Sequence, residues 1–193
     1  ARHSRCHVWA KDAQLVSETN ALRGVASIAA VLVLGCQAMA QGIATSQPVA
    51  AHYERPTDRY PHNIMGSKHA HTDLVVELGD CKTCNEGAGR LVIRLSERLV
   101  FEDFAPRIVD LNLDGRNEIV TGESDQDRGS RLTVWDVILV DGSPKLVRGA
   151  TTDFIGKRFR WLAPVGAADF DLDGQFELAY VEKPHLDKVL KVV

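Results

Sequence analysis

Two short segments place an acidic or amide side chain at every second position, followed by a glycine. The first is Asp110-Leu-Asn-Leu-Asp-Gly115 and the second is Asp169-Phe-Asp-Leu-Asp-Gly174. Without a cation, the carboxylates gathered in such a loop would repel one another. Calcium removes this repulsion, because it accepts about six to eight oxygen ligands and tolerates flexible carboxylate geometry. The spacing therefore predicts a calcium loop in each segment.

Each loop offers five ligands. Side chains supply them at positions one, three, five and nine, and the glycine at position six allows the sharp turn that points the next carbonyl inward. The predicted ligands are Asp110, Asn112, Asp114, the carbonyl of Arg116 and Glu118 in the first loop (residues 110–118), and Asp169, Asp171, Asp173, the carbonyl of Gln175 and Glu177 in the second loop (residues 169–177). The alternative is a solvated acidic turn that binds no metal.

An EF-hand shares the alternating acids and the glycine. Its loop ends in a bidentate glutamate at position twelve, where this chain has Thr121 or Tyr180. The residues that flank both loops also have the alternation of strands rather than the period of helices. The EF-hand interpretation is therefore rejected.

Both loops belong to a longer internal repeat. Residues 104–123 align with residues 162–182 with one residue inserted, and the alignment pairs an Ala-Pro dipeptide, the loop and a closing glutamate. The repeat length is 59 residues, counted from Asp110 to Asp169. This length suits a four-stranded propeller blade, whereas helical solenoid repeats are shorter.

Apolar residues elsewhere occur in short runs with a period near two, typical of strands. The runs are residues 73–78, 90–95, 132–140 and 177–182, and no helical period follows residue 60. We therefore predict an all-β domain over residues 61–193. At the repeat length found here it holds two to three blades, fewer than the four to eight of a closed propeller. We expect a partial propeller or a fragment of one.

The loop pattern Asp-x-Asp/Asn-x-Asp-Gly-x-x-Glu, followed by an apolar strand, resembles the FG-GAP or VCBS repeat of integrin-type propellers and of many exported bacterial proteins. The resemblance covers residues 101–193. It implies calcium-stabilised blades in a non-catalytic module that scaffolds or recognises a protein or another extracellular ligand. The chain lacks the Phe-Gly and Gly-Ala-Pro signatures of this family and keeps only the two Ala-Pro pairs.

Residues 1–40 have the features of a secretory leader. Arg23 precedes an uncharged run with an apolar core at residues 25–35, and Ala38-Met39-Ala40 offers the small residues that signal peptidase requires. We predict cleavage after Ala40 and a periplasmic or secreted protein. One alternative is a lipoprotein signal with lipidation at Cys36. A membrane anchor is disfavoured, because the apolar run is shorter than the ~20 residues that span a bilayer.

Residues 41–60 are rich in Ala, Ser, Thr, Gln and Pro, and they predict an extended linker with order starting near Tyr60. Cys81 and Cys84 lie between two predicted strands, where an exported protein favours a local disulfide. A zinc site with His69 and His71 is an alternative. A redox role would need a βαβ context.

Other function classes have less support. The net charge is −3 and the basic residues are scattered, which argues against nucleic acid as a partner. No Gly-x-Ser-x-Gly nucleophile motif occurs, so the enzyme alternative is a truncated hydrolase acting on polysaccharides or phosphoesters. Three histidines in polar stretches are expected at the surface, and two tryptophans in the core: His52, His62 and His185, then Trp135 and Trp161.

Overall fold

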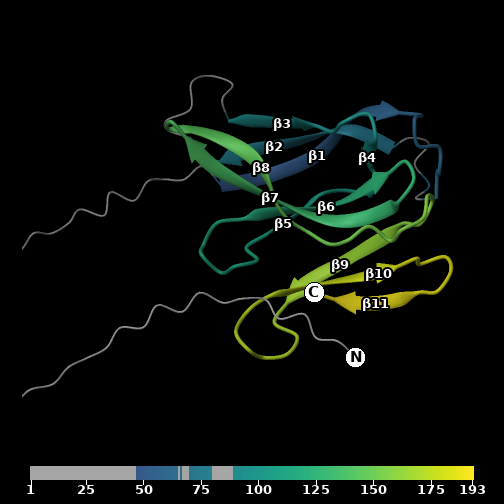
Figure 1. Ribbon diagram of the computed structural model, residues 1–193. Helices are drawn as coiled ribbons and strands as arrows, with labels where there is room; N and C mark the ends of the chain where they lie inside the picture. The colour runs from purple at the N-terminus through teal and green to yellow at the C-terminus, as the bar shows by residue number, and fades with distance from the viewer. Residues whose placement is uncertain (1–46, 65, 67–69, 80–88) are drawn as a thin grey trace, which may run out of the picture. The chain divides into compact units, whose positions relative to one another are not determined.

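The computed structural model describes residues 47–64, 66, 70–79 and 89–193 (Figure 1). Every regular element in these residues is a β-strand, which confirms the all-β prediction. Within the same residues there is no helix of the length and apolar character that crossing a membrane would require. The strands are β1 (Gln47–Thr57), β2 (Ala70–Gly79), β3 (Arg90–Arg94), β4 (Leu99–Phe101), β5 (Arg107–Val109), β6 (Glu118–Asp125), β7 (Gly129–Val140), β8 (Ser143–Thr151), β9 (Leu162–Ala168), β10 (Glu177–Glu182) and β11 (Val189–Val192).

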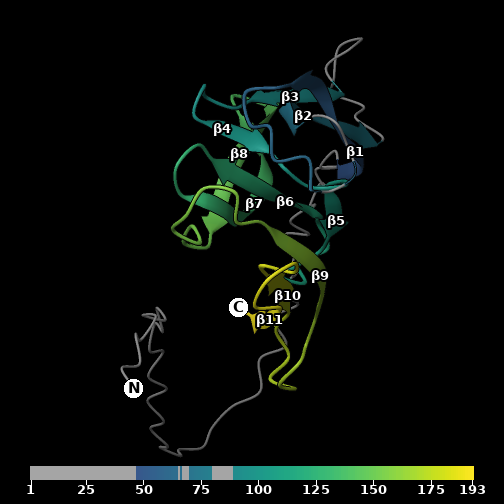
Figure 2. The same cartoon turned by 90° about the vertical axis from the view of Figure 1, so that its right-hand side faces the viewer.

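The larger sheet has the antiparallel order β1-β2-β4-β6-β7-β8, with β3 also paired to β2 and β5 also paired to β6. It curls into a partial barrel (Figures 1 and 2). The concave side holds the main core, in which Leu74, Phe101, Ile119 and Trp135 are almost completely buried. These side chains come from β2, β4, β6 and β7, so residues distant in sequence close one apolar cluster.

Strands β5 to β8 form a four-stranded antiparallel meander, here called repeat 1. Strands β9 to β11 form a separate three-stranded sheet, here called repeat 2 together with Val193. A second apolar cluster joins them, in which Val120 and Leu132 of repeat 1 pack with Leu162 and Tyr180 of repeat 2. This arrangement fits a partial β-propeller-like fold, as predicted.

The linker prediction for residues 41–60 was wrong from residue 47 onward. Residues Gln47–Thr57 form β1, which pairs antiparallel with β2 over most of its length. The strand lies at the sheet edge, and its apolar contribution to the core comes mainly from Ala51 and Tyr53. So few inward apolar residues leave no clear alternation in the sequence.

Several predictions fall outside the described residues. These are the leader at residues 1–40, the lipidation at Cys36, and the state of Cys81 and Cys84 with His69. The two predicted strands on either side of the cysteines do pair as the antiparallel strands β2 and β3. Trp135 is a core residue, only 2% exposed. Trp161 is only half-buried and packs against His185, so its prediction as a core anchor was wrong.

Candidate metal centre

Each acidic loop connects two antiparallel strands. The first joins β5 to β6 and the second joins β9 to β10, on the same side of the molecule in Figure 1. The register pairs Val109 with Glu118 and Ala168 with Glu177, so the first and ninth loop positions come together across a hairpin. The predicted strand flanks are therefore confirmed, and helices do not flank these loops as they do in an EF-hand.

The acid at position one closes each loop. Asp110 accepts hydrogen bonds from the amides of the fifth and sixth loop residues at 3.1 and 2.9 Å. Asp169 accepts from the same two amides at 3.1 and 3.0 Å. Side-chain carboxylates that cap local amides in this way stabilise tight turns.

Three further hydrogen bonds are shared by both loops. Asn112 and Asp171 accept from the fifth amide at 2.9 and 3.1 Å. The fifth acid accepts from the seventh amide at 2.9 Å in the first loop and 2.8 Å in the second. Glu118 and Glu177 each accept from the second amide at 2.8 Å. The ten predicted ligand residues therefore lie in two loops of the same geometry.

The backbone of each loop enters the left-handed region twice. Leu113 and Leu172 have φ values of 58° and 64°, and Gly115 and Gly174 have 83° and 89°. Glycine adopts this conformation freely, whereas leucine pays roughly 1–2 kcal/mol for it. Because both loops carry the same unfavourable leucine conformation, their backbone shape follows from the shared motif.

The side chains of the two loops differ. In the second loop, single oxygens of Asp169, Asp171 and Glu177 lie within 4.8 Å of one another, the only such acidic, histidine or cysteine group in the described chain. The first loop has Asn112 in place of Asp171. In addition, the Arg116 guanidinium binds Asp114 through Nη2 at 2.6 Å and lowers the pKa of that carboxyl.

The loop acids sit in surroundings that suit a cation. Burial raises the pKa of Glu118, the Leu111 amide opposes this shift, and the charges of Asp136, Asp114 and Asp110 raise it further. The donor set in both loops consists of carboxylate and amide oxygens, the ligands that calcium prefers. The residues therefore fit calcium, and the carbonyls of Arg116 and Gln175 remain predicted ligands.

Of the three histidines predicted at the surface, His52 and His185 are exposed as predicted, whereas the prediction for His62 was wrong. His62 Nδ1 lies 2.5 Å from Glu102 Oε1, and the His62 side chain is only 11% exposed. The His185 ring lies 5.9 Å from the His62 ring and accepts a hydrogen bond from Trp161 Nε1 at its Nδ1, 2.7 Å away. No local motif marks either residue, so only the fold brings them together.

The same region contains serines near a carboxylate and an imidazole. Ser124 donates to Glu102 Oε2 at 2.6 Å and also contacts Ser130. Glu102 thus stands between the serine and His62, whereas a hydrolase triad needs the imidazole next to the hydroxyl. We interpret this network as a set of buried polar side chains that satisfy one another's hydrogen bonds.

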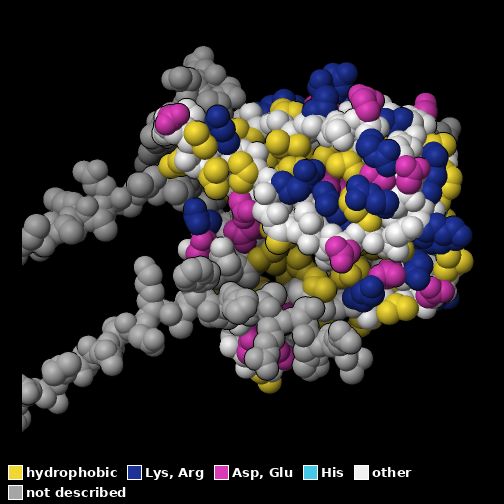
Figure 3. Space-filling view, in the orientation of Figure 1, with side chains coloured by type: hydrophobic (Ala, Val, Ile, Leu, Met, Phe, Trp, Pro, Cys, Tyr) yellow, Lys and Arg dark blue, Asp and Glu magenta, His cyan; other side chains and the backbone are white. Residues whose placement is uncertain are grey.

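Comparisons with protein-family models, with curated proteins and with solved structures found no match to this chain. On the face seen in Figure 3, the distribution of surface charge does not indicate a particular class of partner either, because Lys and Arg side chains lie among acidic ones.

Proposed function

We propose that this chain is an exported calcium-binding β-repeat module of the FG-GAP or VCBS type, which acts as a non-catalytic scaffold or protein-recognition unit. The observation that carries the proposal is the pair of loops with the same five amide hydrogen bonds and the same left-handed backbone positions. An acidic turn with no ligand gives no reason for a second loop of the same geometry elsewhere in the chain. Two copies in equivalent positions of a repeat favour a shared ligand.

The donor chemistry favours calcium over other divalent ions. The second loop groups Asp169, Asp171 and Glu177, and all of its side-chain donors are oxygens. Zinc and copper prefer imidazole or thiolate ligands. Magnesium requires a tighter octahedron and usually keeps several waters. A bound calcium ion would offset the repulsion among the loop acids and so stabilise the hairpin.

The loop surroundings favour recognition over catalysis. The first loop is tied to β1, because Gln47 Nε2 donates to the Gly115 carbonyl at 2.5 Å. Both loops expose the leucine at position four, and the second loop exposes more apolar surface: Leu113 is 52% exposed, whereas Leu172 is 87% and Phe170 is 51% exposed. Exposed apolar residues on a loop held by a cation suit contact with another protein.

Thermal melting tests the proposal. The chain should melt at a higher temperature in excess calcium than in chelator, by the equivalent of about 2.7 kcal/mol for each site at 100 times the dissociation constant of that site. Asp169→Asn should remove a large part of this gain, because Asp169 caps two amides and belongs to the acid group. Asp141→Asn is the matched control, since Asp141 is an exposed turn residue with φ 51° outside both loops.

Melting that is indifferent to calcium would refute the proposal. A response to zinc or reductant instead would favour the alternative metal or redox protein built on Cys81 and Cys84. Turnover of polysaccharide or phosphoester substrates would favour the truncated hydrolase.

A further inference from the structure

The two ends of β9 carry opposite charge. Before the strand, residues 157–160 have the sequence Lys-Arg-Phe-Arg, a formal charge of +3, and are here called the cationic turn. After the strand comes the second acidic loop, with a formal charge of −4 (Figure 1). The seven residues of β9 hold the two ends about 23 Å apart at roughly 3.3 Å per residue. Because the Debye length is about 8 Å at physiological ionic strength, these charges do not neutralise each other within one copy.

The second loop has no countercharge of its own. Within the part of the chain that the structure describes, no Lys, Arg or His forms an ion pair with any of its four carboxylates. Their hydrogen bonds come from neutral donors, namely loop amides and Gln175 Nε2, which donates to Asp173 at 2.9 Å. Asp171 and Asp173 are also exposed. In the first loop, by contrast, Arg116 binds Asp114.

The cationic turn is likewise uncompensated. Among the described residues no carboxylate forms an ion pair with its three cations, Lys157, Arg158 and Arg160. The contacts of the two arginines are with neutral groups of Phe159. The Arg158 guanidinium lies 4.6 Å from the Phe159 ring centroid, and Arg160 Nη1 donates to the Phe159 carbonyl at 3.0 Å. These contacts position the guanidinium groups and leave their charge available.

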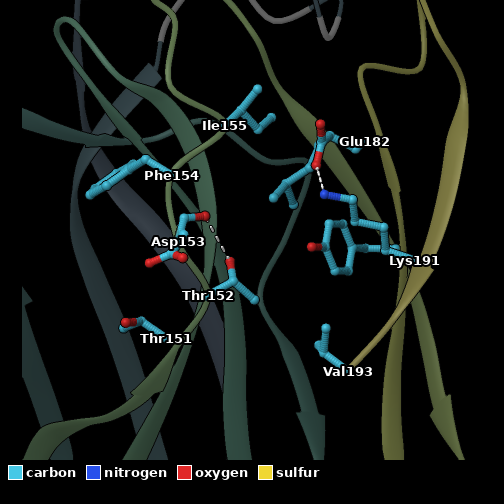
Figure 4. Close-up of a pocket in the computed structure, with 10 residues that line it drawn as sticks. Thr151, Thr152, Asp153, Phe154, Ile155, Glu182, Lys191 and Val193 are labelled. Carbon is cyan, nitrogen blue, oxygen red and sulfur yellow. Dashed lines mark hydrogen bonds and ion pairs between the residues drawn. The ribbon is translucent and has the colours of Figure 1, made fainter. Parts of the chain in front are cut away.

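Acids at the same end of repeat 2 are bound by other cations. Glu182, which pairs with Leu162 at the start of β9, forms an ion pair with Lys191. Both side chains line a cavity of about 490 Å³, and Figure 4 shows them directed toward each other. Asp187 forms an ion pair with Lys183. The cationic turn therefore does not take its countercharge from these two acids.

The backbone of the cationic turn is held in place. The Ser130 amide donates to the Arg160 carbonyl at 2.8 Å, and the Phe159 amide donates to the Tyr60 hydroxyl at 2.8 Å. Phe159 has a φ of 56°, a conformation that non-glycine residues rarely adopt. Gly129 allows the close approach, because a Cβ there would lie 2.7 Å from the Arg160 carbonyl oxygen. Charges on a fixed backbone lose less conformational entropy when a partner binds.

We propose that, without bound calcium, the cationic turn of one copy of this chain binds the second acidic loop of another copy. The chain carries both complementary surfaces, in equal number and at opposite ends of one strand, so the contact is head to tail and leaves one free loop and one free turn on each oligomer. Complementary charge favours this encounter and fixes its orientation.

Bound calcium would cancel two of the four negative charges of the loop and occupy its carboxylates. Calcium should therefore dissociate the oligomers. This competition rests on the proposed function, whereas association in chelator rests on the charges of the chain alone.

Sedimentation velocity of the whole chain in chelator tests the association. At about 0.01 M salt, where the Debye length is about 30 Å, oligomers should form and grow with protein concentration. They should dissociate at about 1 M salt, where it is about 3 Å. Saturating calcium at low salt should weaken the association at least about tenfold.

Two double variants locate the contact. The turn variant is Lys157→Gln with Arg158→Gln, and the loop variant is Asp171→Asn with Asp173→Asn. Each alone should associate at least about tenfold more weakly than the unmodified chain. An equimolar mixture should form a one-to-one complex, because the turn variant keeps its loop and the loop variant keeps its turn. Lys145→Gln is the control, since Lys145 is an exposed cation outside the turn and forms no ion pair among the described residues.

Monomers at low salt in chelator would overturn the proposal. So would a mixture of the two variants that stays monomeric, or a loss in Lys145→Gln equal to that of the turn variant. Association that persists in calcium, although calorimetry shows saturable calcium binding, would overturn the competition. Intact association in a chain that binds no calcium would instead refute the proposed function and support the charge pairing.

Discussion

The two acidic loops have the same backbone conformation but differ in charge. Both use the same five amide hydrogen bonds, at distances that agree within about 0.2 Å. The first loop has three carboxylates and Arg116, a formal charge of −2, and the second has four carboxylates and no cation, a formal charge of −4. Loop shape thus comes from the positions that both copies keep, and charge is set at positions three and seven.

The same contrast extends to the repeats that carry the loops. The glutamate that closes repeat 1, Glu123, is fully buried and binds Arg131 and Arg148 at 2.8 and 2.5 Å. Its equivalent in repeat 2, Glu182, is 13% exposed and pairs with Lys183 and Lys191. Arg148 lies on β8, a strand for which repeat 2 has no counterpart among the described residues. The closing glutamate therefore belongs to a buried ion network in repeat 1, where β8 supplies Arg148, and to less buried ion pairs in repeat 2.

The largest effect expected from this contrast is on unfolding. Glu123→Gln should cost about 3 kcal/mol, because it leaves two partly buried guanidinium groups without their shared carboxylate. Glu182→Gln should cost less than about 1 kcal/mol, since its lysine partners remain accessible to water. Urea unfolding of both variants measures the difference. Equal losses would mean that the two repeats are equally covered.

Alanine at the loop glycines tests the shared backbone. Gly115→Ala and Gly174→Ala should each destabilise the chain by about 1–2 kcal/mol, because both glycines have positive φ. Gly166→Ala is the control, since a Cβ there meets open space and no left-handed conformation is required. Thermal melts should show matching losses for the two loop variants. A large inequality would show that the loops are not equivalent.

Exchange of charge between the loops tests the electrostatic difference. Asn112→Asp combined with Arg116→Gln gives the first loop the side chains of the second at positions three and seven, and should tighten its calcium binding about tenfold, or ~1.4 kcal/mol. Asp171→Asn should weaken the second loop by a similar factor. Calcium titrations of both variants measure these shifts. Unchanged affinities would remove charge as the distinction between the loops.

The smallest effect concerns acid, and it is specific to repeat 2. Burial lowers the pKa of His185, with further lowering by His62 and Arg160 and partial opposition by Glu102. Because the pKa is lower in the folded state, folding favours the neutral ring. This stability is present above the ordinary value of 6.5 and is lost as pH falls below it through the lower folded value.

Melts between about pH 7.5 and about pH 5, a range that brackets the ordinary histidine pKa, should therefore show a loss that His185→Gln reduces. The β6–β7 turn of repeat 1 has Gln126 at the position equivalent to His185, and this side chain does not titrate. Fluorescence of Trp161 should report the same transition, because its Nε1 donates to His185 Nδ1, which protonation blocks. A pH response that persists in His185→Gln would assign the acid sensitivity to another group.

Much of this architecture could be predicted from local pattern. Apolar alternation located β2, β3, β7 and β10 because each strand has one face toward a core. The repeat of acids and glycine located both loops, since their shape depends on contacts within nine residues. Local sequence is sufficient where the determining contacts are local.

The remainder depends on contacts between distant segments. Strand β1 has no clear alternation, yet its backbone pairs with β2 and Tyr53 stacks on Phe101 at 4.9 Å between ring centroids. His62 and His185 meet only because the turn after β10 packs near the segment between β1 and β2. The contact between Arg116 and Asp114 is local. The calcium-loop motif uses only the backbone carbonyl at position seven, so it does not predict that the Arg116 side chain binds Asp114.

Calorimetric titration of the chain with calcium tests the central claim most directly. We expect two ions to bind per chain, with the tighter site lost in Asp169→Asn and the weaker site lost in Asp110→Asn. Titration without saturable binding, or with binding that neither variant reduces, would show that the two loops are acidic turns and not calcium sites.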